Sequence, residues 1–140
     1  MGPRLSTMEN EAIEFHDSVL MRIDHAGDEI RLLFQPAYVH RSSGDPGVDA
    51  GTGWTVDVEL TLFGAQSRSI VPNLPGGVWQ GDLRIDKMEL GNVMALPLDA
   101  SGNIALRIEL MSGEVVEVSG NRVQLLIVSG YTFVEDVSFD

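Results

Sequence analysis

The sequence predicts an all-β, single-domain protein, built as an antiparallel β-sandwich or barrel of about seven to nine short strands. Three observations support this prediction. Apolar and polar residues alternate with a period of two in several segments, turn signals separate these segments, and no segment has a convincing helical period. The chain has 140 residues, a length typical of one domain. We expect a disordered polar arm over residues 1–11 and a single β domain over residues 12–140.

The first predicted hairpin lies in the N-terminal third of the chain. Apolar residues alternate with polar ones over residues 19–23 and again over residues 30–34, on either side of a turn at residues 25–28. The spacing of apolar residues over 12–23 also fits one face of a helix. We prefer the strand, because a turn signal follows it directly. Pro36 should end or kink the second strand of this hairpin.

Glycine and proline punctuate the middle of the chain. Residues 42–53 are predicted to form the longest loop, because four glycines and a proline interrupt them. The clearest strand follows at residues 54–62, where one face can pack on a core while the other faces water. Residues 70–80 are predicted to be a packed loop, since two prolines and two glycines break the apolar run. A tight turn is expected at residues 86–87.

The C-terminal third continues the same alternation over residues 104–110 and 116–118. Residues 123–128 are apolar at nearly every position, which predicts a strand buried on both faces. The aromatic tail over residues 130–139 could cover a sheet edge. The predicted core consists of Trp54, Val56, Val58, Leu60, Leu62, Ile104, Leu106, Ile108, Leu110, Val116, Val118, Leu125 and Ile127.

The charge balance restricts the classes of partner. The net charge is −12, from 21 acidic and 9 basic residues. Such a field repels nucleic acids and anionic membrane surfaces, so we expect neither as a partner. It suits a basic protein partner, although an acidic surface also serves solubility. The chain has no cysteine and no apolar run long enough to span a membrane, so we expect a soluble, cytoplasmic protein, a monomer or a dimer, without a cofactor.

The run His16-Asp17-Ser18 contains the residue types of a hydrolytic triad. Members of such triads normally come from distant parts of a chain and meet only in the fold. Asp17 or Ser18 is better explained as a partner for nearby backbone groups at the start of an element. We therefore predict no catalytic residue here.

A polar cluster is the candidate site, and it consists of His16, Asp17, Tyr38, His40 and Arg41. If the first two strands pair as a hairpin, the first four of these approach one another at its open end, beside the glycine-rich loop. The cluster is interpreted either as a binding site or as a structural network. A weaker alternative is a metal site formed by His16, Asp17 and His40, since two histidines and a carboxylate can hold iron or zinc.

Several short motifs resemble those of a known group of proteins. They are Phe15-His16-Asp17-Ser18, Ala37-Tyr38-Val39-His40-Arg41-Ser42, Gly51-Thr52-Gly53-Trp54, the run over residues 112–118, and Phe133-Val134-Glu135-Asp136. Together they resemble small uncharacterised bacterial proteins that open with Phe-His-Asp-Ser or Phe-His-Asp-Ala. Some proteins with a similar opening look like immunity proteins of bacterial polymorphic toxin systems. The resemblance implies no functional residue.

Two functions follow as hypotheses. The first is a non-enzymatic binding or interaction protein, immunity-like in the sense of that resemblance. The alternative is a small metal- or ligand-binding barrel that uses His16, Asp17 and His40. An acidic all-β chain without a catalytic constellation favours the first.

The charge balance yields a direct test. We expect the protein not to retard duplex DNA or RNA in a gel-shift assay at about 50 mM salt, because a chain without a basic stripe cannot displace counterions from phosphates. Retardation that weakens as the salt concentration rises would contradict this expectation.

Overall fold

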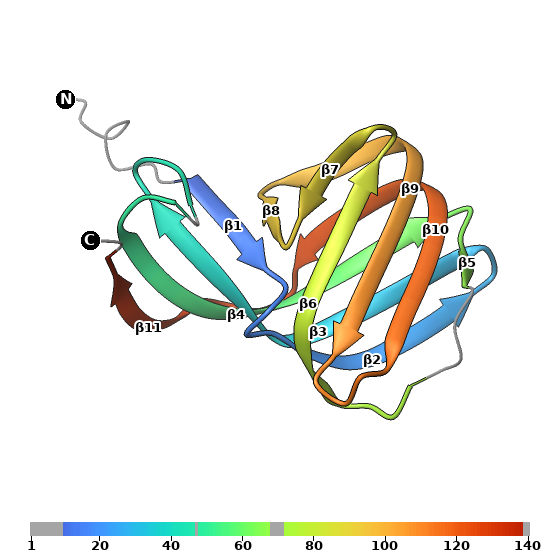
Figure 1. Cartoon of the computed structure of the whole chain (residues 1–140), viewed down its shortest axis with the longest axis horizontal. Helices are drawn as coiled ribbons and strands as arrows, with labels where there is room; N and C mark the ends of the chain where they lie inside the picture. The colour runs from blue at the N-terminus through green and yellow to red at the C-terminus, as the bar shows by residue number, and fades with distance from the viewer. Residues whose placement is uncertain (1–9, 47, 68–71, 139–140) are drawn as a thin grey trace.

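The computed structural model describes residues 10–46, 48–67 and 72–138, and these ranges are built from strands joined by turns (Figure 1). They contain no helix long and apolar enough to cross a membrane. The prediction of an all-β fold is confirmed, because the described residues form strands and turns and no helix. The strands are β1 (Asn10–Glu14), β2 (Val19–Ala26), β3 (Glu29–Ser42), β4 (Gly51–Phe63), β5 (Gln66–Ser67), β6 (Gly76–Ile85), β7 (Met88–Gly91), β8 (Val93–Ala95), β9 (Leu98–Leu110), β10 (Val115–Ile127) and β11 (Thr132–Val137).

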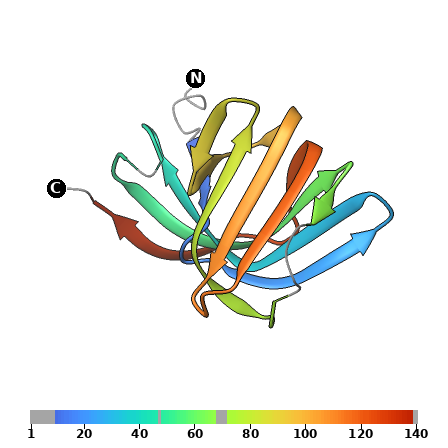
Figure 2. The ribbon, with the colours of Figure 1, turned by 45° about the vertical axis from the view of Figure 1, so that its right-hand side comes forward.

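Six antiparallel strands close into a barrel in the order β2, β3, β4, β10, β9 and β6, with β6 returning to β2. The closing contact between β2 and β6 is short, since it joins only Val19 to Gly77 and Leu20 to Gly76 among the described residues. Figure 2 shows β6, β9 and β10 passing in front of β2, β3 and β4, so that two layers of strands enclose the core. Of the two predicted architectures, the barrel is the one observed.

Two barrel strands extend beyond the barrel into a second sheet, which we call the wing. The wing consists of residues 37–42 of β3, residues 51–56 of β4, and strands β1, β8 and β11. It lies on the left of Figure 1. The register of β3 against β4 shifts between Phe34 and Ala37, so the predicted irregularity at Pro36 is confirmed. The wing is thus continuous with the barrel wall.

The core forms from the inward residues of the alternating strands, as predicted, with two exceptions. Trp54 is only partly buried, and Ile127 is 41% exposed, so its placement in the core was wrong. The pairing of β10 with β9 ends at Leu125, whereas its pairing with β4 continues to Ile127. The prediction of a strand buried on both faces was therefore wrong, because among residues 123–128 only Val123 and Leu125 are buried, while Leu126 and Val128 are also exposed.

Glycines misled the prediction of two loops, and the predicted boundary of the arm also differs from the structure. The predicted loop over residues 42–53 is shorter, because β4 already begins at Gly51. A Cβ at Gly51 would lie 1.8 Å from the carbonyl oxygen of Arg41, so glycine allows close strand approach there. Gly76 and Gly77 likewise begin β6 rather than a packed loop. The strand β1 begins at Asn10, inside the predicted arm.

Phe15, between β1 and β2, is a central core contact. Its ring is fully buried, and the ring centroid lies 5.9 Å from that of Phe34. The ring also lies directly over Gly81 of β6, where a Cβ would come within 2.5 Å of the Phe15 Cγ and 2.9 Å of the Ile108 Cδ1. The absence of a side chain at Gly81 therefore fixes how closely β6 approaches this part of the chain.

Gly81→Ala is expected to destabilise the fold by roughly 1–3 kcal/mol, because the added methyl group overpacks the core against the Phe15 ring. Urea denaturation followed by circular dichroism measures the change. Gly130→Ala is the matched control, since nothing lies within 4 Å of a Cβ at that position. Equal unfolding free energies for the two variants would contradict the packing described.

Candidate functional site

The segment between β1 and β2 directs its side chains alternately into the core and outward. Phe15 enters the core, and Asp17 takes a left-handed backbone conformation with φ of 69°. The buried Ser18 hydroxyl donates to the Glu14 carbonyl oxygen at 2.8 Å and accepts from the Tyr38 backbone N–H at 3.1 Å. The prediction that Ser18 bonds nearby backbone is confirmed. With its hydroxyl engaged on both sides, Ser18 is unsuited to act as a nucleophile.

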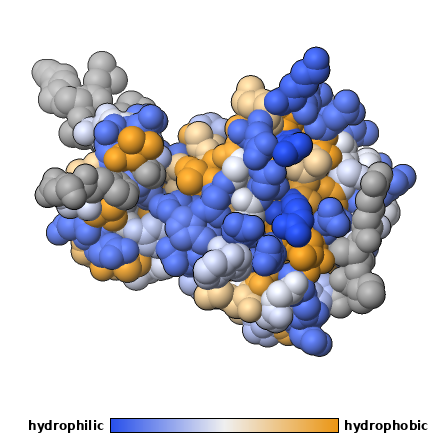
Figure 3. Space-filling model, viewed as in Figure 1, coloured by the Kyte–Doolittle hydropathy of each residue, from blue (hydrophilic) through white to orange (hydrophobic). Residues whose placement is uncertain are grey.

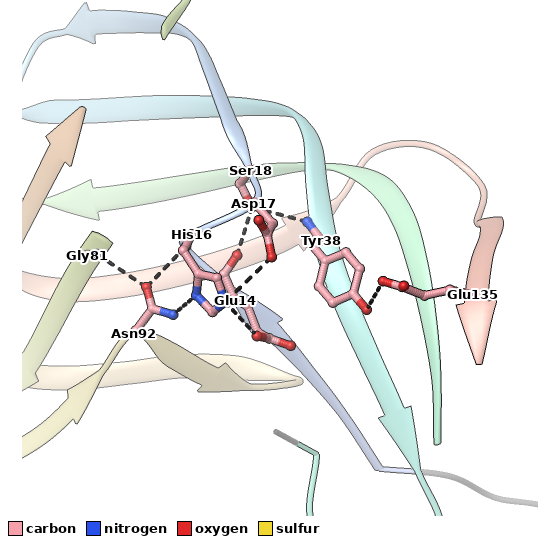
Figure 4. A network of polar contacts seen from close by, with 8 residues as sticks. All are labelled: Glu14, His16, Asp17, Ser18, Tyr38, Gly81, Asn92 and Glu135. Atoms are coloured by element: carbon pink, nitrogen blue, oxygen red, sulfur yellow. Dashed lines mark hydrogen bonds and ion pairs between the residues drawn. The ribbon is translucent and has the colours of Figure 1, made fainter. Parts of the chain in front are cut away.

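Asn92 sets the hydrogen-bonding state of the His16 ring. The Asn92 Oδ1 accepts from the backbone N–H groups of His16, at 3.1 Å, and Gly81, at 3.3 Å. Its Nδ2 therefore faces the His16 Nδ1, which must accept a hydrogen bond in the neutral ring. The proton then resides on Nε2, which donates to the Glu14 Oε1 at 3.1 Å and lies 3.5 Å from the Asp17 Oδ2 (Figure 4).

Tyr38 connects three strands of the wing. It lies on β3, and its hydroxyl donates to the Glu135 Oε2 of β11 at 3.0 Å (Figure 4). Between these strands, a Cβ at Gly53 of β4 would lie 2.1 Å from the Tyr38 hydroxyl oxygen. Gly53 is therefore the residue that lets the ring cross β4. Burial, together with the hydrogen bond and the charge of Glu135, raises the pKa of Tyr38 well above its ordinary value.

These side chains open onto a surface hollow that we call the acidic pocket. It is lined by Glu14, Asp17, Tyr38, Glu135, Asp136, Val137 and Ser138. Burial raises the pKa of Glu14; His16 and His40 oppose this shift, while Asp17 and Glu135 add to it. The rise comes first from the burial of Glu14. Four of the lining residues, Glu14, Asp17, Glu135 and Asp136, are acidic, and none of the lining residues is basic. The hollow is therefore chemically suited to a cationic group.

Arg41 does not belong with the other predicted site residues. Its Nε donates to the Glu11 Oε2 at 2.6 Å, and its guanidinium carbon lies 4.8 Å from the Trp54 ring centroid and 4.1 Å from that of Tyr131. The Tyr131 hydroxyl also donates to the Glu11 carboxylate, at 3.1 Å. We call these four residues the aromatic clamp. Side chains alternate along β3, so Arg41 and Tyr38 point to opposite faces, and the predicted grouping was wrong for Arg41.

His40 occupies the same face of β3 as Tyr38, but it is fully buried. In the wing it pairs with Ala12 of β1 and Gly53 of β4. The described ranges contain no group of three or more histidine, aspartate or glutamate side chains that could hold a metal ion. The geometry thus gives no support to a metal site formed by His16, Asp17 and His40.

The residues of the site that were missed from the sequence include Glu14, Asn92 and Glu135, which bond to the predicted residues His16 and Tyr38. Glu14 could have been found, because it shares a strand face with His16 in any extended reading of this segment. Asn92 and Glu135 lie 76 and 97 residues along the chain from their partners His16 and Tyr38. Only the fold brings such distant side chains together.

Glu14→Gln is expected to change how stability depends on pH. Because burial raises the pKa of Glu14 above 4.5, the folded protein holds this proton more tightly than the unfolded chain does. The stabilising contribution is therefore present at low pH and is lost as the pH rises through the raised pKa. In urea denaturation from about pH 4 to 7, wild-type stability should fall relative to Glu14→Gln. A stability difference between the two proteins that is constant with pH would contradict this.

No protein-family model, no curated protein and no solved structure matches this chain. Its function must therefore be inferred from the side chains and their geometry.

Proposed function

We propose that this is a non-enzymatic binding protein whose acidic pocket receives a cationic side chain of a basic protein partner. The observation that carries the proposal is that four carboxylates and no basic side chain line the pocket. Glu14 and Glu135 converge on it from β1 and β11, with Asp17 between β1 and β2. The raised pKa of Glu14 reflects burial that the neighbouring histidines do not offset.

A guanidinium or ammonium group would relieve this imbalance directly. An opposite charge near a partly buried carboxylate favours its ionised form, so the pocket and a cation stabilise each other. Arginine is particularly suitable, because its planar fork can bond two carboxylate oxygens at once. The net charge of −12 would also speed encounters with a basic partner.

The hydrogen bonding at the pocket favours binding over catalysis. Ser18 is buried and bonded on both sides, so the apparent His-Asp-Ser run does not offer a nucleophile. The neutral His16 ring uses Nδ1 toward Asn92 and Nε2 toward Glu14. Ser18 and His16 therefore position their neighbours through hydrogen bonds and stabilise the shape of the pocket.

The binding proposal extends to a biological role and a cellular location. The motif resemblance suggests an immunity-like protein that neutralises a basic partner. The cysteine-free composition fits a cytoplasmic location. Both extend the binding proposal and depend on it.

Acetyl-arginine amide is a suitable probe, because it carries one guanidinium and is too short to form a strand. Titration followed by amide NMR shifts should perturb residues around the pocket. Asp17→Asn combined with Glu135→Gln should weaken binding by about fivefold, since each exposed ion pair contributes less than about 1 kcal/mol. Asp24→Asn combined with Asp28→Asn is the charge-matched control in the β2–β3 hairpin.

Two results would contradict the proposal. One is the absence of shifts at the pocket in the wild-type protein at millimolar probe. The other is equal weakening by the pocket variant and the hairpin control, which would indicate attraction to net charge alone. Acetyl-glutamine amide, which lacks the positive charge, should leave the pocket signals unchanged.

A further inference from the structure

The strand β11 forms one edge of the wing. Among the described residues it pairs only with β4, and Thr132 to Asp136 are exposed. An edge strand presents a row of backbone donors and acceptors that another extended chain can use. Phe133 and Val134 are 51% and 47% exposed, and Figure 3 shows hydrophobic residues among hydrophilic ones on the wing. The edge therefore combines backbone hydrogen-bonding capacity with exposed apolar surface.

Contacts with the rest of the wing hold β11 in an extended form. Glu135 accepts the hydrogen bond of Tyr38, and the Phe133 ring lies 5.3 Å from the Trp54 ring, edge to face. Trp54 in turn belongs to the aromatic clamp, which also includes Tyr131, the residue just before β11. A partner would meet a strand that is already ordered, which lowers the entropic cost of binding.

The two faces of β11 differ in chemistry. Glu135 pairs with Gly53 in register and reaches Tyr38, so it belongs to the face of the acidic pocket. Phe133 pairs with Trp54, on the face of the aromatic clamp. A chain added beside β11 would place successive side chains on these two faces in turn. Basic residues suit the first face and apolar residues suit the second.

Charge complementarity favours a basic segment over a second copy of this chain as the strand added beside β11. A second copy would place Glu135 and Asp136 beside the same acidic residues, between chains that each carry a net charge of −12. Like charges on neighbouring strands are destabilising. A basic segment instead brings opposite charge to the same edge.

We propose that β11 is the docking edge for an extended basic segment of the partner protein, which adds a strand to the wing. Arginine or lysine at alternate positions enters the acidic pocket, and the intervening apolar residues pack against Phe133. Backbone hydrogen bonds supply affinity and the alternating side chains supply specificity. This inference rests on the proposed function, because the same pocket receives the basic side chains.

The probe is an acetylated and amidated heptapeptide of alternating valine and arginine, added to the full chain. It should bind at least about tenfold more tightly than acetyl-arginine amide, because strand addition contributes backbone bonds as well as charge. It should also slow hydrogen exchange at alternate amides of β11. Two further peptides carry N-methyl groups on the even or on the odd residues. One of these two peptides presents its methyl groups to β11. That peptide should bind weakly and should not slow hydrogen exchange at the β11 amides.

Four other results of the peptide experiment would each overturn a different part of the inference. If both N-methylated peptides bind as tightly as the parent, strand addition is wrong, while pocket shifts with acetyl-arginine amide would still support the proposed function. If a valine-glutamine peptide binds as tightly as the parent, the basic character of the segment is wrong. Slowed exchange of β11 that depends on protein concentration without peptide would make a second copy the occupant. Exchange protection by the parent peptide without pocket shifts would refute the pocket and retain the edge.

Discussion

The long antiparallel ladder between β3 and β4 is the constraint on which the rest of the structure depends. It runs from Ile30 paired with Leu62, inside the barrel, to Arg41 paired with Thr52, in the wing. The barrel half contributes buried leucines to the core, and the wing half carries Tyr38, Gly53 and the aromatic clamp. No flexible linker is needed to position the pocket, because the β3–β4 ladder that forms part of the barrel wall continues into the wing.

The pocket depends on this ladder for its electrostatics as well as its shape. Tyr38 and Glu135 come from strands on either side of β4, and Glu14 comes from β1 on the other side of β3. The pairing of β1, β3, β4 and β11 therefore brings together carboxylates of β1, of the β1–β2 segment and of β11, which are far apart in sequence. Their mutual repulsion is tolerated because core packing at Phe15 and backbone pairing hold the strands in place.

Local alternation of apolar residues predicted much of the barrel. The buried apolar residues of β4 over residues 56–62 and of β9 over residues 104–110 recur at every second position, and that pattern is a local property of the chain. The wing was predicted only in part. The tail over residues 130–139 was expected to cover a sheet edge, and β11 pairs with β4, but the pairing of β1 with β8 leaves no local signal. Gly51 and Gly53 were taken as loop residues, since a sequence does not distinguish a glycine that turns the chain from one that admits a neighbouring group. Arg41 was misplaced even though the same period of two puts it opposite Tyr38.

Gly53 has a consequence for how this chain can vary. The space that a side chain would occupy at position 53 is filled by the ring of Tyr38, so the two positions share one volume. Enlargement at position 53 is compatible with the wing only if position 38 becomes smaller at the same time, and that exchange would remove the contact with Glu135. The pair should therefore change together or not at all, which makes it a distinctive mark for finding other chains built in the same way.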